Sequence, residues 1–67
     1  MMDLEEVAEV ARYIKDVYDI CGKWDQAQIE GLHYAKINFG TVADTDKMWI
    51  FSTARSMHLD EVNNGGY

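Results

Sequence analysis

The chain has 67 residues, which is enough for one small domain and excludes a two-domain enzyme. Its composition is that of a globular protein, with 48% hydrophobic and 27% charged residues, no proline and five glycines, so a disordered or low-complexity chain is excluded. Twelve acidic residues against six basic ones leave a net charge of −6. Such a chain gains little attraction to the phosphates of nucleic acid.

A domain of this size buries only about 60% of the surface of its unfolded chain, so it usually needs a disulfide, a metal or a second subunit. Cys21 is the one cysteine, and no Cys/His cluster has zinc spacing. We therefore expect no cofactor, and an interface with a partner or a second copy. The start of the chain has no signal-peptide pattern, and no apolar run reaches the roughly 18 residues of a membrane span. We expect a cytoplasmic, intracellular protein.

The first predicted element is a helix over residues 3–21. Its apolar residues recur at alternating steps of three and four, as one face of a helix requires: Leu4, Val7, Ala11, Ile14, Tyr18 and Cys21. Asp3 is a good N-cap, and Glu6 completes a capping box with it. Gly22 is expected to end the helix in the left-handed conformation.

A second helix is predicted over residues 25–39. Asp25 is the expected cap, with Gln28 at the reciprocal position of a capping box. One face of this helix carries its apolar and small residues, which are Trp24, Ala27, Gly31, Leu32, Ala35 and Phe39. Gly40 closes the segment.

A third helix is predicted over residues 45–62, capped by Asp44 or Thr41. Its apolar stripe consists of Ile50, Phe51, Ala54, Met57 and Val62. The sequence Asn-Asn-Gly-Gly at 63–66 is a strong stop signal, so residues 63–67 are expected to form a flexible tail.

The expected fold is therefore an all-α, compact three-helix bundle in a single domain. The alternative is an α+β fold, in which the first helix packs on a β-hairpin that pairs residues 32–39 with 47–53. The segment 32–39 has respectable β-propensity, and Met48-Trp49-Ile50-Phe51 is a short apolar run that fits a buried strand as well as a helix.

The first helix has more apolar surface than one packing face needs. A second row, Val10, Tyr13, Val17 and Ile20, widens the apolar arc to about 200°, where a surface helix needs a little over 100°. Either this helix lies centrally between the other two, or the second row is a surface strip for a partner or for a second copy in a homodimer. Trp49 is a further candidate for partner contact, because it projects away from the stripe of the third helix.

Residues able to carry chemistry are few. Glu30 and His33 have the Glu-x-x-His spacing of di-iron bundles, but the motif occurs once and faces away from the predicted core. Cys21 ends an apolar seam, where a buried and inert thiol is expected. His33 and His58 have no spacing that would pair them with this thiol. We therefore expect neither an enzyme nor a metal site.

The acidity itself suggests a function. The candidate carboxylates are Glu5, Glu9, Asp16 and Asp19 on the first helix, with Asp44, Asp46, Asp60 and Glu61 around the third. The hypothesis is a non-enzymatic protein-binding module that covers a basic surface of a nucleic-acid-processing or defence complex, as a phage-type inhibitor or nucleic-acid mimic would. The alternatives are a structural homo-oligomer and a helix-turn-helix-like regulator, which the acidic charge disfavours. No motif is specific enough to name a family.

Overall fold

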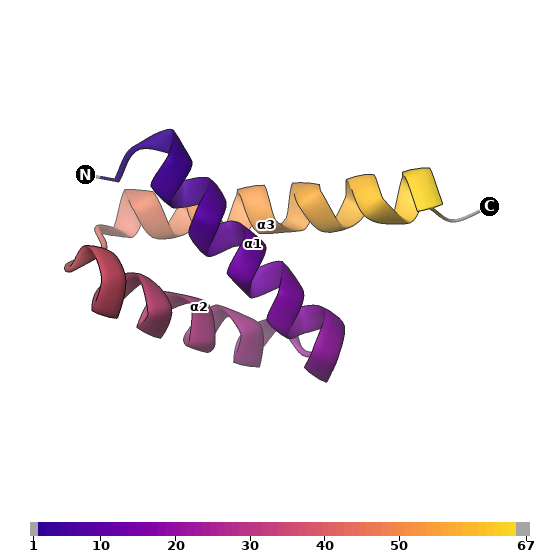
Figure 1. Ribbon diagram of the computed structural model, residues 1–67, viewed down its shortest axis with the longest axis horizontal. Helices are drawn as coiled ribbons and strands as arrows, with labels where there is room; N and C mark the ends of the chain where they lie inside the picture. Colours follow the sequence, from indigo (N-terminus) through magenta and orange to yellow (C-terminus); the bar gives the residue numbers. More distant parts are fainter. Residues whose placement is uncertain (1, 66–67) are drawn as a thin grey trace.

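The computed structural model describes the backbone of residues 2–65 and the side chains of residues 2–63, and it contains three helices (Figure 1). These are α1 (Leu4–Cys21), α2 (Trp24–Phe39) and α3 (Asp44–Gly65). The predicted all-α three-helix bundle is confirmed. The hairpin alternative is wrong, because residues 32–39 and 47–53 are helical throughout. Neither segment has the strict alternation of apolar and polar residues that a half-buried strand requires.

The ends of α1 follow their local signals. The Asp3 side chain accepts a hydrogen bond from the Glu6 amide at 2.9 Å, and the Glu6 side chain accepts one from the Asp3 amide at 3.1 Å. Gly22 has a φ of 73°, and its N–H donates to the Tyr18 carbonyl at 2.7 Å. These bonds satisfy backbone groups that a helix leaves free at its ends, so α1 begins and ends as predicted.

The other two helices differ from the prediction at their ends. The N-cap position of α2 is Lys23, which makes no capping bond, so Asp25 lies inside the first turn and interacts with the positive end of the helix instead. Helix α3 starts at Asp44, which is therefore its first residue and not its cap. It continues past the expected end to Gly65, and residues 66–67 of the predicted tail lie outside the described residues.

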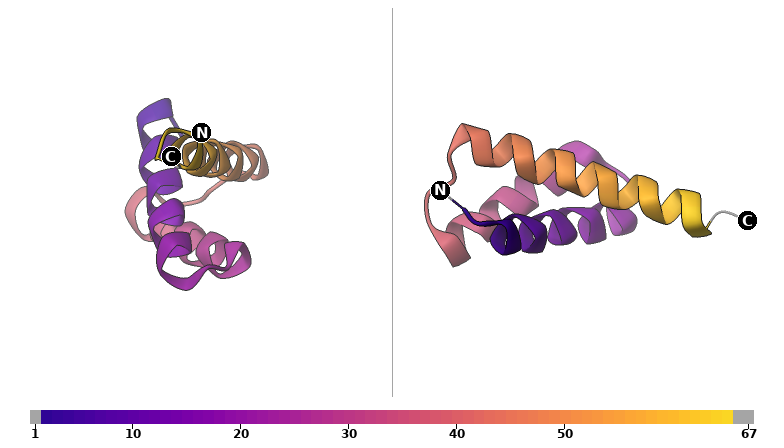
Figure 2. Two further views of the ribbon diagram at one scale, coloured as in Figure 1. Left: turned by 90° about the vertical axis from the view of Figure 1, so that its right-hand side faces the viewer. Right: turned by 90° about the horizontal axis from the view of Figure 1, so that it is seen from above.

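Helix α1 lies alone in one layer, and α2 and α3 lie side by side in the other (Figure 2). Both pack against α1 but make few contacts with each other. This arrangement accounts for the excess apolar surface of α1, because two neighbours cover a wider arc than one. Val10 is fully buried, and Tyr13 and Val17 are half-buried. The interpretation of α1 as the central helix is confirmed.

The contact of α1 with α2 depends on small residues. Ala27, Gly31 and Ala35 are all buried and recur at every fourth position of α2. Ile14 of α1 lies directly over Gly31: a Cβ atom at residue 31 would lie 2.7 Å from the Ile14 Cδ1 atom, and closer still to Cγ1. The absence of a side chain at Gly31 therefore sets how closely the two helices approach.

The contact of α1 with α3 is centred on Ile50 and Ala54, which are fully buried. Phe51 and Met57 of the predicted stripe are half-buried around them, whereas Val62 is exposed. Figure 1 shows that the last turns of α3 extend past the other two helices.

An aromatic cluster joins the second half of α3 to the turn between α1 and α2. Tyr18 and Trp24 stack with their ring centroids 4.0 Å apart, and the His58 ring meets Tyr18 edge-on at 5.0 Å. The Arg55 guanidinium lies 5.8 Å from the centre of the Trp24 ring, within the range of a cation–π interaction. Trp24 therefore contributes to the fold and not to a free surface.

We predict that Gly31→Ala destabilises the domain by about 2 kcal/mol, although alanine is the better helix former by about 1 kcal/mol. The reason is the overlap with Ile14. In an Ile14→Ala background the nearest remaining Ile14 atom is Cβ, which would be 3.5 Å from the new methyl group, an ordinary contact. Gly31→Ala should therefore be neutral or stabilising there. Urea unfolding of the four proteins in this double-mutant cycle gives the coupling, and additive effects would contradict the prediction.

Candidate protein-interaction surface

The outer face of α1 is the side turned away from both neighbouring helices, and it faces the viewer in Figure 1. Its exposed residues include four carboxylates and one arginine, namely Glu5, Glu9, Asp16, Asp19 and Arg12. Fourteen residues separate the first and last of these carboxylates, a rise of about 21 Å along a helix. All four were predicted as members of an acidic surface, and the structure brings them onto one face. We call these four carboxylates the α1 acidic face.

One member of the α1 acidic face is also bonded to the fold. Glu9 accepts a hydrogen bond of 2.6 Å from the Tyr34 hydroxyl of α2. The Tyr34 ring in turn stacks on Tyr13 with centroids 4.4 Å apart. The hydrogen bond to Glu9, assisted by partial burial and by the negative charge of Glu9, raises the pKa of Tyr34 above its ordinary value of 10.0.

Lys15 neutralises part of the acidic charge where α1 meets α3. Its ammonium group pairs with Asp19 at 3.1 Å and also with Glu61 of α3. The hydrogen bond to Glu61 and then that to Asp19 raise the pKa of Lys15 above its ordinary value of 10.5. Glu61, predicted as part of a free acidic surface, is therefore committed to an ion pair.

The remaining acidic candidates on α3 divide into exposed and buried. Asp44 and Asp60 are exposed, and the Asp44 carboxylate lies 3.5 Å from the Lys47 ammonium group. Asp46 is buried, which corrects its assignment to the acidic surface. The Met2 amide donates a hydrogen bond to its Oδ2 atom at 3.3 Å, and the Met2 side chain is itself buried. Met2, which precedes α1, therefore covers part of Asp46.

Most of the predicted apolar strip on α1 is not available to a partner. Val10 is fully buried, and Tyr13 and Val17 are half-buried against the other helices. Their assignment as partner contacts is therefore wrong for Val10 and holds at most for the exposed edges of the other two. Ile20 and Trp49 are exposed, at 87% and 54%. A homodimer through this strip would lack most of its expected contact surface.

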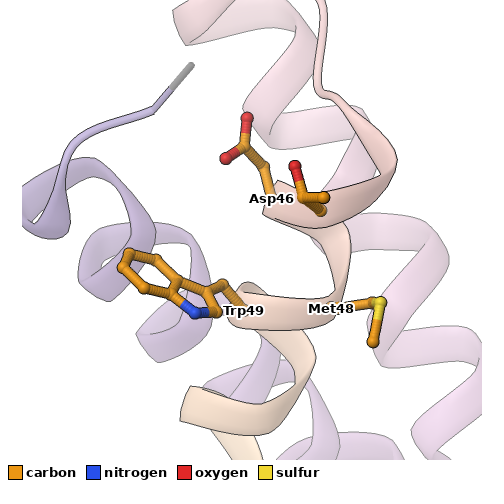
Figure 3. A pocket seen from close by; sticks show the side chains of 4 residues that line it. Asp46, Met48 and Trp49 are labelled. Carbon is orange, nitrogen blue, oxygen red and sulfur yellow. The ribbon is translucent and has the colours of Figure 1, made fainter.

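A pocket lies at the start of α3 (Figure 3). In the described part of the chain it is lined by Thr45, Asp46, Met48 and Trp49, and its volume is about 360 Å³. Figure 3 shows the Asp46 carboxylate and the Trp49 ring on the α1 side of α3, and Met48 on the opposite side. Sequence reasoning found Trp49 but missed this pocket. No local signal reveals it, because the burial of Asp46 depends on the chain segment before α1.

Of the residues considered for chemistry, Glu30, His33 and Cys21 are exposed, and His58 lies in the aromatic cluster with Tyr18 and Trp24. Glu30 and His33 are on the surface of α2, where Glu30 accepts a hydrogen bond from Gln26 at 3.1 Å. Among the described residues, no three His, Cys, Asp or Glu side chains are grouped to hold a metal ion. Cys21 is exposed, with its Sγ atom 3.6 Å from the Lys23 carbonyl, so the expected burial of this thiol is wrong. It is the last residue of α1, beyond the part that the other helices cover.

None of the described helices is long and apolar enough to cross a membrane. Comparisons of the chain with protein-family models, with curated proteins and with solved structures find no match. The surfaces of the molecule and their chemistry therefore carry the functional inference.

The raised pKa of Lys15 predicts how stability depends on pH. Since the folded pKa lies above the unfolded value, the ion pairs stabilise the protein fully below pH 10.5 and lose their effect as the pH rises through the folded pKa. The raised pKa of Tyr34 has the same consequence. Its hydrogen bond to Glu9 stabilises the protein fully below pH 10.0 and loses its effect as the pH rises through the folded pKa. Lys15→Met should therefore lower the free energy of unfolding at pH 8 and flatten its alkaline decline. Urea unfolding between pH 8 and 11.5 measures this, and parallel curves for the two proteins would refute it.

Proposed function

We propose that this domain is an intracellular, non-catalytic protein-binding module whose α1 acidic face occupies a basic, nucleic-acid-binding surface of a partner. The observation that supports the proposal most is the position of Glu5, Glu9, Asp16 and Asp19 on the one side of α1 that no other helix covers. In this proposal the partner belongs to a nucleic-acid-processing or defence complex, and the domain acts as an inhibitor of the phage type by covering its surface.

The geometry is suited to a surface that binds phosphates. A helix holds its carboxylates at fixed positions along a line, so little conformational entropy is lost when all of them meet a basic surface together. The roughly 21 Å covered by the α1 acidic face is about the length of six phosphates along one strand of duplex DNA, at 3.4 Å per phosphate. Long-range attraction between opposite charges also speeds the encounter of the two proteins.

The rest of the surface supplies the apolar contact that such a complex needs. Charged residues at the rim of an interface speed the association of the two proteins and orient them, whereas exposed aromatic and aliphatic residues provide most of the affinity. Ile20 lies at the C-terminal end of α1, and Trp49 projects toward α1 from α3 (Figure 3). Both are exposed, and Ile20 directly follows Asp19 of the α1 acidic face.

The proposal predicts a loss of affinity from two changes that leave the fold intact. Glu5→Gln with Asp16→Asn removes two negative charges from the α1 acidic face, and neither side chain makes a hydrogen bond or ion pair in the described structure. A matched control, Asp25→Asn with Glu30→Gln, removes two exposed charges from α2 instead. We expect the first double variant to bind the partner about tenfold more weakly, and the control to change affinity less than twofold.

The measurement uses the immobilised domain and DNA-binding proteins isolated on phosphocellulose from the cells in which the protein occurs. Partners retained by the domain should be released by a short duplex DNA and by moderate salt, because DNA and the α1 acidic face compete for the same basic surface. If duplex DNA releases nothing, or if the two double variants lose affinity equally, the α1 acidic face is not the binding surface.

A further inference from the structure

Asp46 is the one buried charged side chain among the described residues, and it is 4% exposed. An ionised carboxylate can accept about four hydrogen bonds, and a buried one is normally paired with a cation or saturated with donors. In the described chain Asp46 receives one hydrogen bond, of 3.3 Å, from the Met2 amide to its Oδ2 atom. The ion pairs of the described lysine side chains, those of Lys15 and Lys47, involve other carboxylates. Its Oδ1 atom therefore retains acceptor capacity.

The pocket beside Asp46 combines this carboxylate with apolar surface. Trp49 is 54% exposed, so one large apolar side chain is in contact with water on the same side of α3 as the buried carboxylate, whereas Met48 lies on the opposite side (Figure 3). In Figure 3 the Asp46 carboxylate and the Trp49 ring project to the same side of α3. The face of an indole ring attracts cations, and its edges pack well against methylene groups. The pocket thus offers a negative end and an apolar wall.

The ligand that fits such a pocket has a compact cationic head on an apolar stem. Arginine binds carboxylates best through two parallel hydrogen bonds, one to each oxygen, which requires both oxygens to be accessible, and Asp46 is 4% exposed. A lysine ammonium group needs one oxygen only, and its four-carbon stem can lie along an indole ring.

We propose that the pocket at the start of α3 binds a lysine side chain of the partner protein, with the ammonium group on Asp46 and the stem against Trp49. This inference rests on the proposed function, since it names one contact on the basic surface that the domain would cover. The bond between Met2 and Asp46 holds the pocket next to the first turn of α1, which carries Glu5. The pocket therefore lies near the N-terminal end of the α1 acidic face, on the side of α3 that faces α1 (Figure 3).

A small probe tests the pocket without any partner. The chain has two tryptophans, Trp24 and Trp49. In a Trp24→Phe background only Trp49 remains, so tryptophan fluorescence reports on the pocket alone. We expect N-acetyl-lysine-N-methylamide to change this fluorescence saturably at millimolar concentrations. The norleucine analogue, which has the same stem without the ammonium group, should bind at least about tenfold more weakly. Equal binding of the two analogues, or tighter binding of the arginine analogue, would overturn the assignment.

The decisive variant is Asp46→Asn, which keeps an acceptor for the Met2 amide and removes only the charge. We expect it to weaken binding of the lysine analogue about tenfold and to leave binding of the norleucine analogue unchanged. Asp44→Asn is the matched control, because it removes an exposed carboxylate from the same turn of α3. It should alter affinity less than twofold. If Asp46 had only a structural role, its variant would shift the melting temperature without changing the preference for lysine over norleucine.

The result separates this inference from the proposed function. If the lysine analogue fails to bind while duplex DNA still releases retained partners, the lysine pocket is wrong and the α1 acidic face remains the binding surface. If the lysine analogue binds with the expected preference but no partner is released by DNA, the pocket stands and the proposed function is wrong.

Discussion

The close contact between Ile14 and Gly31 determines how the rest of the molecule is built. Because residue 31 has no side chain, α1 approaches α2 closely enough for small residues to form that interface. The apolar side chains that α1 does not use against α2 are then free to meet Ile50 and Ala54 of α3. One helix therefore supplies the packing surface for both of its neighbours.

This dependence on α1 leaves α2 and α3 without much contact of their own, so two contacts besides those of Ile50 and Ala54 hold α3. In its second half the aromatic cluster of Tyr18, Trp24 and His58 ties it to the turn that follows α1. In its first turn the Met2 amide is bonded to Asp46. The buried core is small and rich in alanine, so it yields only modest stability. Binding to a partner would add to that stability by mass action.

The same arrangement decides which charges are free. A helix that is covered on two sides has one side left for water, and on α1 that side carries four carboxylates and a single arginine. Lys15 is drawn into ion pairs with Asp19 and Glu61, so it offsets the acidity at one end of the helix only. The proposed lysine pocket lies at the other end, where a buried carboxylate and an exposed indole ring adjoin the first turn of α1. The proposed pocket thus lies at the end of α1 whose acidity Lys15 does not offset.

Local signals in the chain were sufficient for the number of helices, for both ends of α1, and for most of the apolar face of each helix, although Leu4, Cys21 and Val62 are exposed. Capping boxes, left-handed glycines and apolar spacing act within a few residues of each other, and they need no tertiary contact. The start of α2 was missed by one residue, because its N-cap position lacks a side-chain bond and the helix begins at a tryptophan that is packed against Tyr18. The residue at which α2 begins therefore depends on a contact with a residue outside α2.

The division of the wide apolar arc of α1 between core and surface was decided by the tertiary structure. The spacing of Val10, Tyr13 and Val17 fits a central helix and a partner-binding strip equally well, and only the positions of α2 and α3 distinguish the two. Asp46 is the sharpest case. Its place in the first turn of a helix predicts an exposed, dipole-stabilising carboxylate, but a segment 44 residues earlier in the chain covers it. Burial is a property of what packs on a residue, and pairing over such a separation leaves no trace in the local pattern.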